Sequence, residues 1–103
     1  MKNIRLGAVT PMGSVTTAAQ FFIDLLDNSP DATPDGRAAG ITPASMRRRF
    51  KLIDLFTEKK DEESVQIEDS DFDYLNKLFA ASAYGKSARA VIEVEDRLLE
   101  AAK

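Results

Sequence analysis

The spacing of apolar residues predicts four helices along this chain. In each of four segments, apolar side chains recur every three or four residues, which is the repeat of a helix with one buried face. The segments run from Ser14 or Thr16 to about Asp27, from Pro43 to about Glu58, from Ser70 to about Tyr84, and from about Ser87 to Ala102. The residues expected to form the core are Phe22, Leu25, Phe50, Ile53, Phe56, Leu75, Phe79, Ile92 and Leu99.

Local signals support these boundaries. Thr42-Pro43 joins a side chain that can cap a helix to a proline suited to the first helical position. Residues 70–73 resemble a capping box with acids in the first turn, where the helix dipole favours them. Gly85 suits the left-handed residue that ends many helices. At the start of the first helix, either Ser14 or Thr16 can act as the cap.

Two short segments can add a small β-sheet. Residues 3–8 alternate weakly between apolar and polar, and residues 64–68 do the same, so the two can pair as strands. Residues 29–41 hold two prolines and two glycines and predict a long loop, which is either functional or mobile. The predicted fold is therefore mainly α with minor β, a four-helix single domain over residues 1–103.

Composition narrows the function. The 103 residues include no cysteine and no histidine, which removes disulfides, thiolate chemistry and the commonest general base and metal ligand. No apolar run is long enough to cross a membrane, and the first residues lack the apolar core of a signal peptide. We therefore expect a soluble, intracellular protein without enzymatic activity, cofactor or metal, although a carboxylate site assembled from distant segments stays open.

Four cations lie within the six residues 46–51 (MRRRFK), although the net charge is −3. A helical wheel places Arg47 and Lys51 on the solvent side, with Asp54 in reach of Lys51. Arg48 falls at the edge of the apolar arc. Arg49 falls within it, so its charge needs a partner or a route to water.

Glu95 presents the converse problem on the fourth helix, because the wheel places it in the middle of the apolar face. We therefore predict that Arg49 and Glu95 pair, either within one chain or between two copies of it. In the alternative, both apolar stems lie along the surface and the charged heads reach water. The candidate interaction residues are Arg48, Arg49, Lys51 and Glu95.

The acids Asp69, Asp71 and Asp73 follow the spacing of the start of a calcium loop. The sixth position of such a loop turns sharply and is normally glycine, but here it is Tyr74. A helix start explains the acids better than a metal does.

Met46-Arg47-x-Arg49 leads to Ile53-Asp54-x-Phe56, a charged turn follows, and then comes VQIEDxDFxYL over residues 65–75. This pattern, within residues 42–79, resembles small uncharacterised proteins encoded by tailed bacteriophages and prophages. The shared motif is structural: a helix, a strand and a capped helix. The resemblance implies a phage-encoded protein and brings no catalytic residues.

The expected function is a non-enzymatic protein-interaction module, a phage virion or assembly accessory protein located in the host cytoplasm or the virion. Its expected partners are itself, as a homo-oligomer, or other viral proteins, with the N-terminal segment and residues 29–41 as contact elements. One alternative is an inhibitor or sponge that acts on a host defence protein or a nucleotide, with Arg48, Arg49 and Lys51 contacting the anion. A second is a DNA-binding regulator that uses helix 43–58, although the acidic net charge argues against nucleic acid.

Overall fold

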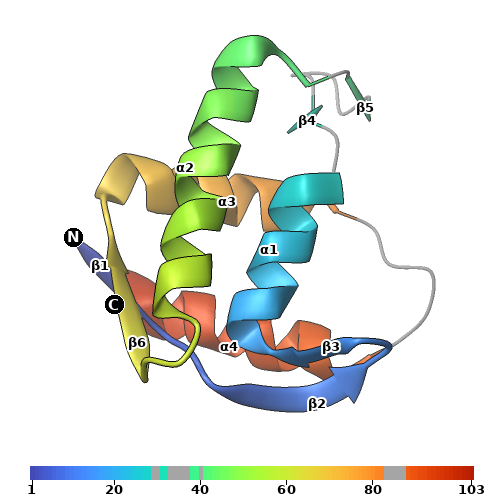
Figure 1. Ribbon diagram of the computed structural model, residues 1–103, viewed down its shortest axis with the longest axis vertical. Coiled ribbons are helices and arrows are strands. Elements are labelled where there is room, and N and C mark those ends of the chain that lie inside the picture. Colours follow the sequence, from blue (N-terminus) through green and yellow to red (C-terminus); the bar gives the residue numbers. More distant parts are fainter. Residues whose placement is uncertain (29–30, 33–37, 40, 83–87) are drawn as a thin grey trace.

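The computed structural model describes residues 1–28, 31–32, 38–39, 41–82 and 88–103, and within them it shows a mainly helical fold with minor β-structure (Figure 1). The helices are α1 (Ala18–Asn28), α2 (Pro43–Lys59), α3 (Asp69–Ala81) and α4 (Arg89–Ala102). The antiparallel strand pairs are β1 (Lys2–Arg5) with β6 (Ser64–Ile67), β2 (Ala8–Met12) with β3 (Val15–Thr17), and β4 (Asp31–Ala32) with β5 (Ala38–Ala39). This architecture confirms the predicted fold class.

The predicted pairing of residues 3–8 with residues 64–68 is confirmed for its first part, since β1 ends at Arg5 and Ala8 belongs to β2. β1 and β6 are antiparallel, with Lys2 opposite Ile67 and Arg5 opposite Ser64. Ile4 lies opposite Val65, and both side chains are buried. These strands are short, so burial of their apolar side chains supplies most of their stability.

The first helix begins later than the sequence predicts. Residues 15–17 form β3, and the residue that caps α1 is Thr17, whose Oγ1 accepts a hydrogen bond from the Gln20 amide at 3.1 Å. The predicted caps Ser14 and Thr16 are therefore wrong. Three consecutive β-branched residues favour extended backbone, which explains why the strand extends into the expected first turn. For α2 the predicted cap is correct, since the Thr42 side chain accepts a hydrogen bond from the amide of Ser45.

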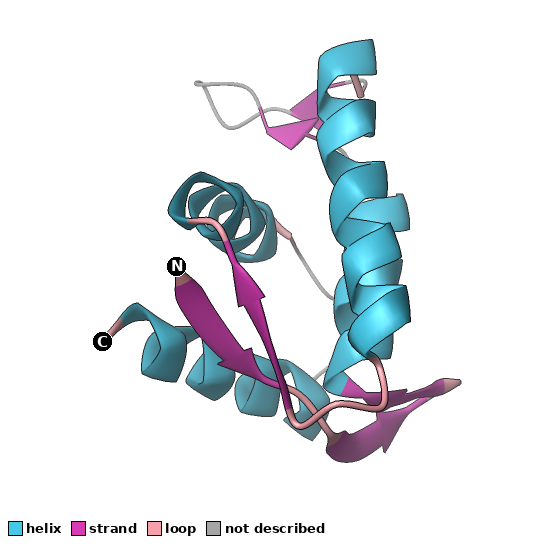
Figure 2. Cartoon of the chain, turned by 60° about the vertical axis from the view of Figure 1, so that its left-hand side comes forward, coloured by secondary structure: helices cyan, strands magenta, loops and turns pink. Residues whose placement is uncertain are grey.

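The four helices share one hydrophobic core with β1, β2, β3 and β6. α1 and α2 run side by side in opposite directions, and α4 lies against β1 and β2 at the other end of the molecule (Figure 1). Figure 2 shows α4 lying far from the upper half of α2. Phe22 on α1 stacks on Phe56 on α2, with ring centroids 5.1 Å apart. None of the helices in the described part of the chain combines the length and apolar content needed to cross a membrane.

The rotation of two helices differs from the prediction. On α2 the buried side chains are Arg49, Leu52 and Phe56, while Phe50 is 57% exposed. On α4 the predicted core residues Ile92 and Leu99 are 57% and 58% exposed, and the buried residues are Ala90, Val94, Leu98 and Ala101. α4 contacts β1 and β2, and two of its four buried residues are alanines, whose own apolar area is small.

Hydrogen bonds join α4 to β2 and to the residue before it. The Glu93 carboxylate accepts hydrogen bonds from the Thr10 amide at 2.8 Å and from the Thr10 hydroxyl at 2.7 Å. Arg97 donates to the carbonyl oxygens of Gly7 and Ala8. Segments separated by more than eighty positions in the sequence are thus joined by directional bonds.

Glu93→Gln is expected to reduce stability at neutral pH but to have less effect in acid. The hydrogen bond from the Thr10 amide, and then that from its hydroxyl, lowers the pKa of Glu93 below its ordinary value of 4.5. A group with a lowered folded-state pKa stabilises the protein above the unfolded value and loses that contribution as the pH falls through the folded value. Thermal unfolding from pH 7 to pH 3 checks this, with the exposed neighbour Asp96→Asn as the control. If the melting temperatures of Glu93→Gln and the wild type differed as much at pH 3 as at pH 7, the prediction would be wrong.

Two predictions concern segments that the structure describes only in part. Of the predicted loop 29–41, the described residues are 31–32, 38–39 and 41, and the first two pairs form β4 and β5. The remainder of that loop and the predicted cap Gly85 lie outside the described residues.

Candidate functional site

The arginine run on α2 enters a polar network between α1, α2 and α3. Arg49 is buried, with 2% of its surface exposed, as the wheel predicted. Its Nε donates to the Tyr74 hydroxyl and its Nη1 to the carbonyl oxygen of Leu26, both at 2.9 Å. The planar guanidinium thus joins three helices with two directional bonds.

The contact with Leu26 explains why a cation is tolerated inside. Leu26 lies in the last turn of α1, where carbonyl oxygens lack partners within the helix and the dipole is negative. No residue in that turn is basic. The buried guanidinium of Arg49 therefore supplies, from another helix, the positive charge and the donor that the end of α1 requires.

Tyr74 on α3 connects the arginines to one another. Its hydroxyl lies 2.6 Å from Ser45 Oγ as well as accepting from Arg49. The guanidinium of Arg48 lies 5.4 Å from the centre of the Tyr74 ring, within the range of a cation–π contact. The edge position predicted for Arg48 is thus used to cover an aromatic ring.

Asp71 lies between the other two candidate cations and forms an ion pair with each. It is 4% exposed, and its carboxylate lies 3.4 Å from Arg48 Nε and 3.0 Å from Lys51 Nζ. Lys51 also lies 3.7 Å from Glu68, so its partners are these acids rather than the predicted Asp54. The hydrogen bond and the charge of Asp71, followed by the charge of Glu68, raise the pKa of Lys51 above its ordinary value of 10.5.

Sequence reasoning missed the role of Asp71. α3 begins at Asp69 with Glu68 as its N-cap and no side-chain cap, so the predicted capping box at 70–73 is wrong. A signal was present: Asp71 precedes Leu75 and Leu78 by four and seven residues, which places it on the buried stripe of α3. An acid on a buried stripe requires a cationic partner, and Arg48 and Lys51 on α2 supply it.

The predicted pair of Arg49 with Glu95 is wrong. Arg49 bonds to Tyr74 and Leu26, whereas Glu95 is exposed on the outer side of α4. The burial of Arg49 within its own chain also keeps it from reaching a second copy. The error follows from the rotation of α4, because the residues taken as its apolar face, Ile92 and Leu99, point outward with Glu95 between them.

Within the described residues, two helix surfaces carry exposed large apolar side chains. The first, here called the α2 outer face, consists of Met46, Arg47 and Phe50, of which Met46 is 42% exposed. The second, the α4 outer face, consists of Ile92, Glu95, Asp96 and Leu99. Each set falls within one narrow arc of its helix. Arg47 and Glu95 have no ion-pair partner among the described residues.

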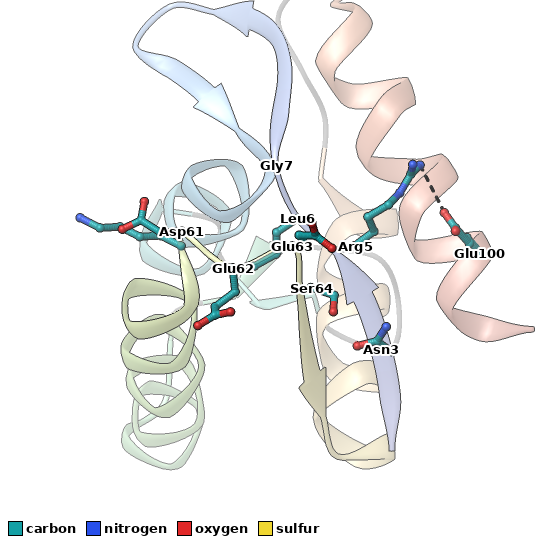
Figure 3. A pocket seen from close by; sticks show the side chains of 10 residues that line it. Asn3, Arg5, Leu6, Gly7, Asp61, Glu62, Glu63, Ser64 and Glu100 are labelled. Carbon is teal, nitrogen blue, oxygen red and sulfur yellow. Dashed lines mark ion pairs between the residues drawn. The ribbon is translucent and has the colours of Figure 1, made fainter.

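A shallow depression of about 560 Å³ lies between β1, the turn after α2, and α4 (Figure 3). Its charged lining includes Arg5 and Glu100, which form an exposed ion pair at 3.4 Å. The carboxylates of Asp61, Glu62 and Glu100 point in different directions and do not converge on one point. Within the described part of the chain, no three acids lie close enough together to hold a metal ion.

The comparisons with known proteins identify no relative. Among family models, curated proteins and solved structures, none matches this chain.

Proposed function

We propose that this chain is a non-enzymatic protein-interaction module, an accessory or assembly component of a tailed-bacteriophage particle that associates with itself or with other particle proteins. The observation that supports this most is the exposure of large apolar side chains on the α2 and α4 outer faces. Phe50, Ile92 and Leu99 are each more than half exposed, whereas the core is filled by other apolar side chains, five phenylalanines among them. Clustered apolar side chains rimmed by charge are typical of docking surfaces.

The two alternatives use the arginine run and receive less support. A DNA-reading helix presents several unpaired cations to the phosphates. Here Arg49 is buried, and the charges of Arg48 and Lys51 are balanced by those of Asp71 and Glu68. An anion-binding sponge meets the same difficulty, because Asp71 would repel the ligand from these two cations.

Mass spectrometry of purified particles, together with light scattering of the isolated protein, tests the proposal. We expect the chain to be present in stoichiometric amounts in particles, and the isolated protein to gain mass with concentration or to bind another particle protein. A protein that is absent from particles and stays monomeric would overturn the proposal. Steeply salt-dependent binding to duplex DNA would favour the regulator instead.

A further inference from the structure

We propose that α4 is an autoinhibitory strap, which occupies the hydrogen-bonding edge of β2 and prevents that edge from pairing with the same edge of a second copy. The edge meant here is the side of β2 that points away from β3. This inference goes beyond the proposed function, because it concerns what restrains self-association and not where the protein acts. It depends on the bonds between α4 and β2, and the α2 and α4 outer faces play no part in it.

The outward backbone groups of β2 lie at Ala8 and Thr10. The Ala18 amide donates to the Gly7 carbonyl oxygen, and Ala8 lies opposite Thr17. Bonded and non-bonded positions alternate along an antiparallel pair, so the backbone groups of Ala8 point away from β3. Thr10 falls in the register shift that follows Ala8, and its amide donates to a side chain of α4 instead of to β3.

Two side chains of α4, one helical turn apart, occupy this edge. Glu93 accepts a hydrogen bond from the Thr10 amide at 2.8 Å, and Arg97 Nη2 donates to the Ala8 carbonyl oxygen at 2.9 Å. A neighbouring strand would place its own carbonyl oxygen and its own amide at these two positions. Because α4 fills both positions, β2 has no free edge for another strand while α4 is docked.

A second copy of β2 fits the edge once α4 has left it. The edge offers an acceptor at Ala8 and a donor at Thr10, two residues apart. Two such edges in antiparallel orientation exchange these groups, since Ala8 of each copy then lies opposite Thr10 of the other. The contact is self-complementary about a twofold axis. Pro11 has no amide hydrogen and ends the pairing, so we expect a dimer and no larger assembly.

The apolar contacts of α4 are smaller than those of its neighbours. α1 and α3 each bury two phenylalanines and two leucines, whereas the buried residues of α4 are Val94, Leu98 and two alanines. The main contacts of α4 are with β1 and β2 and not with another helix. Glu93 and Arg97 are half-buried, so water competes for their hydrogen bonds. We therefore expect α4 to separate from β2 in a local opening that leaves α1 and α2 folded.

Hydrogen exchange of the wild-type protein, followed by NMR, tests whether α4 opens as a unit. The amides of α4 and the Thr10 amide should share one protection factor, about tenfold or more below that of the buried amides of α1. Equal protection of α4 and α1 would show that α4 leaves β2 only when the whole chain unfolds, and would overturn the proposal. This measurement needs no variant.

A double variant that removes both edge contacts tests the restraint on self-association. Glu93→Ala combined with Arg97→Ala leaves the net charge unchanged. The matched control is Arg89→Ala combined with Asp96→Ala, which also preserves the net charge and removes two exposed side chains of the same helix. The apparent affinity of the edge is proportional to the fraction of molecules in which α4 is open. In sedimentation velocity, we expect the first variant to dimerise about tenfold more tightly than the wild type, and the control to match the wild type. A first variant that associates no more than the control would overturn the proposal.

Protection of the Thr10 amide identifies the surface that the dimer uses. In the dimer of the first variant, this amide should exchange about tenfold more slowly than in the monomer, because it donates to Ala8 of the second copy. A dimer in which the Thr10 amide exchanges as fast as in the monomer would use another surface and would overturn the pairing.

Failure of this inference is distinguishable from failure of the proposed function. A chain that is abundant in particles, but whose double variant associates no more than the control, would refute the strap and leave the particle role intact. A chain that is absent from particles, but whose double variant dimerises through β2, would uphold the strap and refute the particle role.

Discussion

Replacing Arg49 with alanine is expected to lower the free energy of unfolding by about 3 kcal/mol. The guanidinium is almost fully buried and donates to the Leu26 carbonyl and the Tyr74 hydroxyl. Without it, the carbonyl at the end of α1 loses a buried donor, and the missing side chain leaves a cavity between three helices. Urea unfolding followed by circular dichroism measures the loss, and for a chain of this size the melting temperature should fall by roughly 12 °C or more.

Two variants at the arginine run separate burial from charge. Arg47→Ala removes the same kind of side chain two residues earlier, where it is exposed, and should change stability by less than about 0.5 kcal/mol. Arg49→Lys keeps the charge, but a single ammonium cannot reproduce the planar guanidinium that reaches both partners. We therefore expect its loss of unfolding free energy to lie between those of Arg47→Ala and Arg49→Ala. If Arg49→Ala were as mild as Arg47→Ala, the buried guanidinium would make no net contribution to stability.

The features that sequence predicts well here are those set by neighbouring residues. The Thr42 cap needs only a side-chain oxygen ahead of a proline, and the pairing of β1 with β6 follows from two short alternating segments. The inward direction of Arg49 was also predictable, because helical periodicity fixes its angle relative to Phe56.

The features that it predicts poorly depend on which surfaces meet. The helical wheel gives most weight to large apolar side chains and so assigned Ile92 and Leu99 to the core. The buried residues of α4 are instead Ala90, Val94, Leu98 and Ala101, two of which are small. The same limit applies to the candidate site. Two of the four candidate residues, Arg48 and Lys51, share Asp71, which lies at least twenty positions away in the sequence. No local pattern specifies that α3 crosses α2 at this point.

Asp71→Asn is expected to lower the free energy of unfolding by about 1–2 kcal/mol more than Asp69→Asn does. Both acids lie in the first turn of α3, where the helix dipole favours a negative charge, so the comparison largely removes that contribution. Asp69 is exposed and, among the described residues, pairs with the N-terminal amine, whereas Asp71 is buried against Arg48 and Lys51. Both cations are about half exposed and can be hydrated after the change, which keeps the loss below that expected for Arg49.

The pH dependence of this difference identifies its cause. Because the pKa of Lys51 is raised in the folded state, its contribution is complete below 10.5 and is lost as the pH rises through the folded value. The difference in unfolding free energy between the wild type and Asp71→Asn should therefore become smaller at alkaline pH. It should not vanish, since Arg48 remains charged and still faces Asp71. Urea unfolding at pH 7 and above pH 10.5 measures both values. Equal losses of unfolding free energy for Asp69→Asn and Asp71→Asn at neutral pH would contradict this prediction. They would show that the ion pairs of Asp71 with Arg48 and Lys51 make no net contribution to stability.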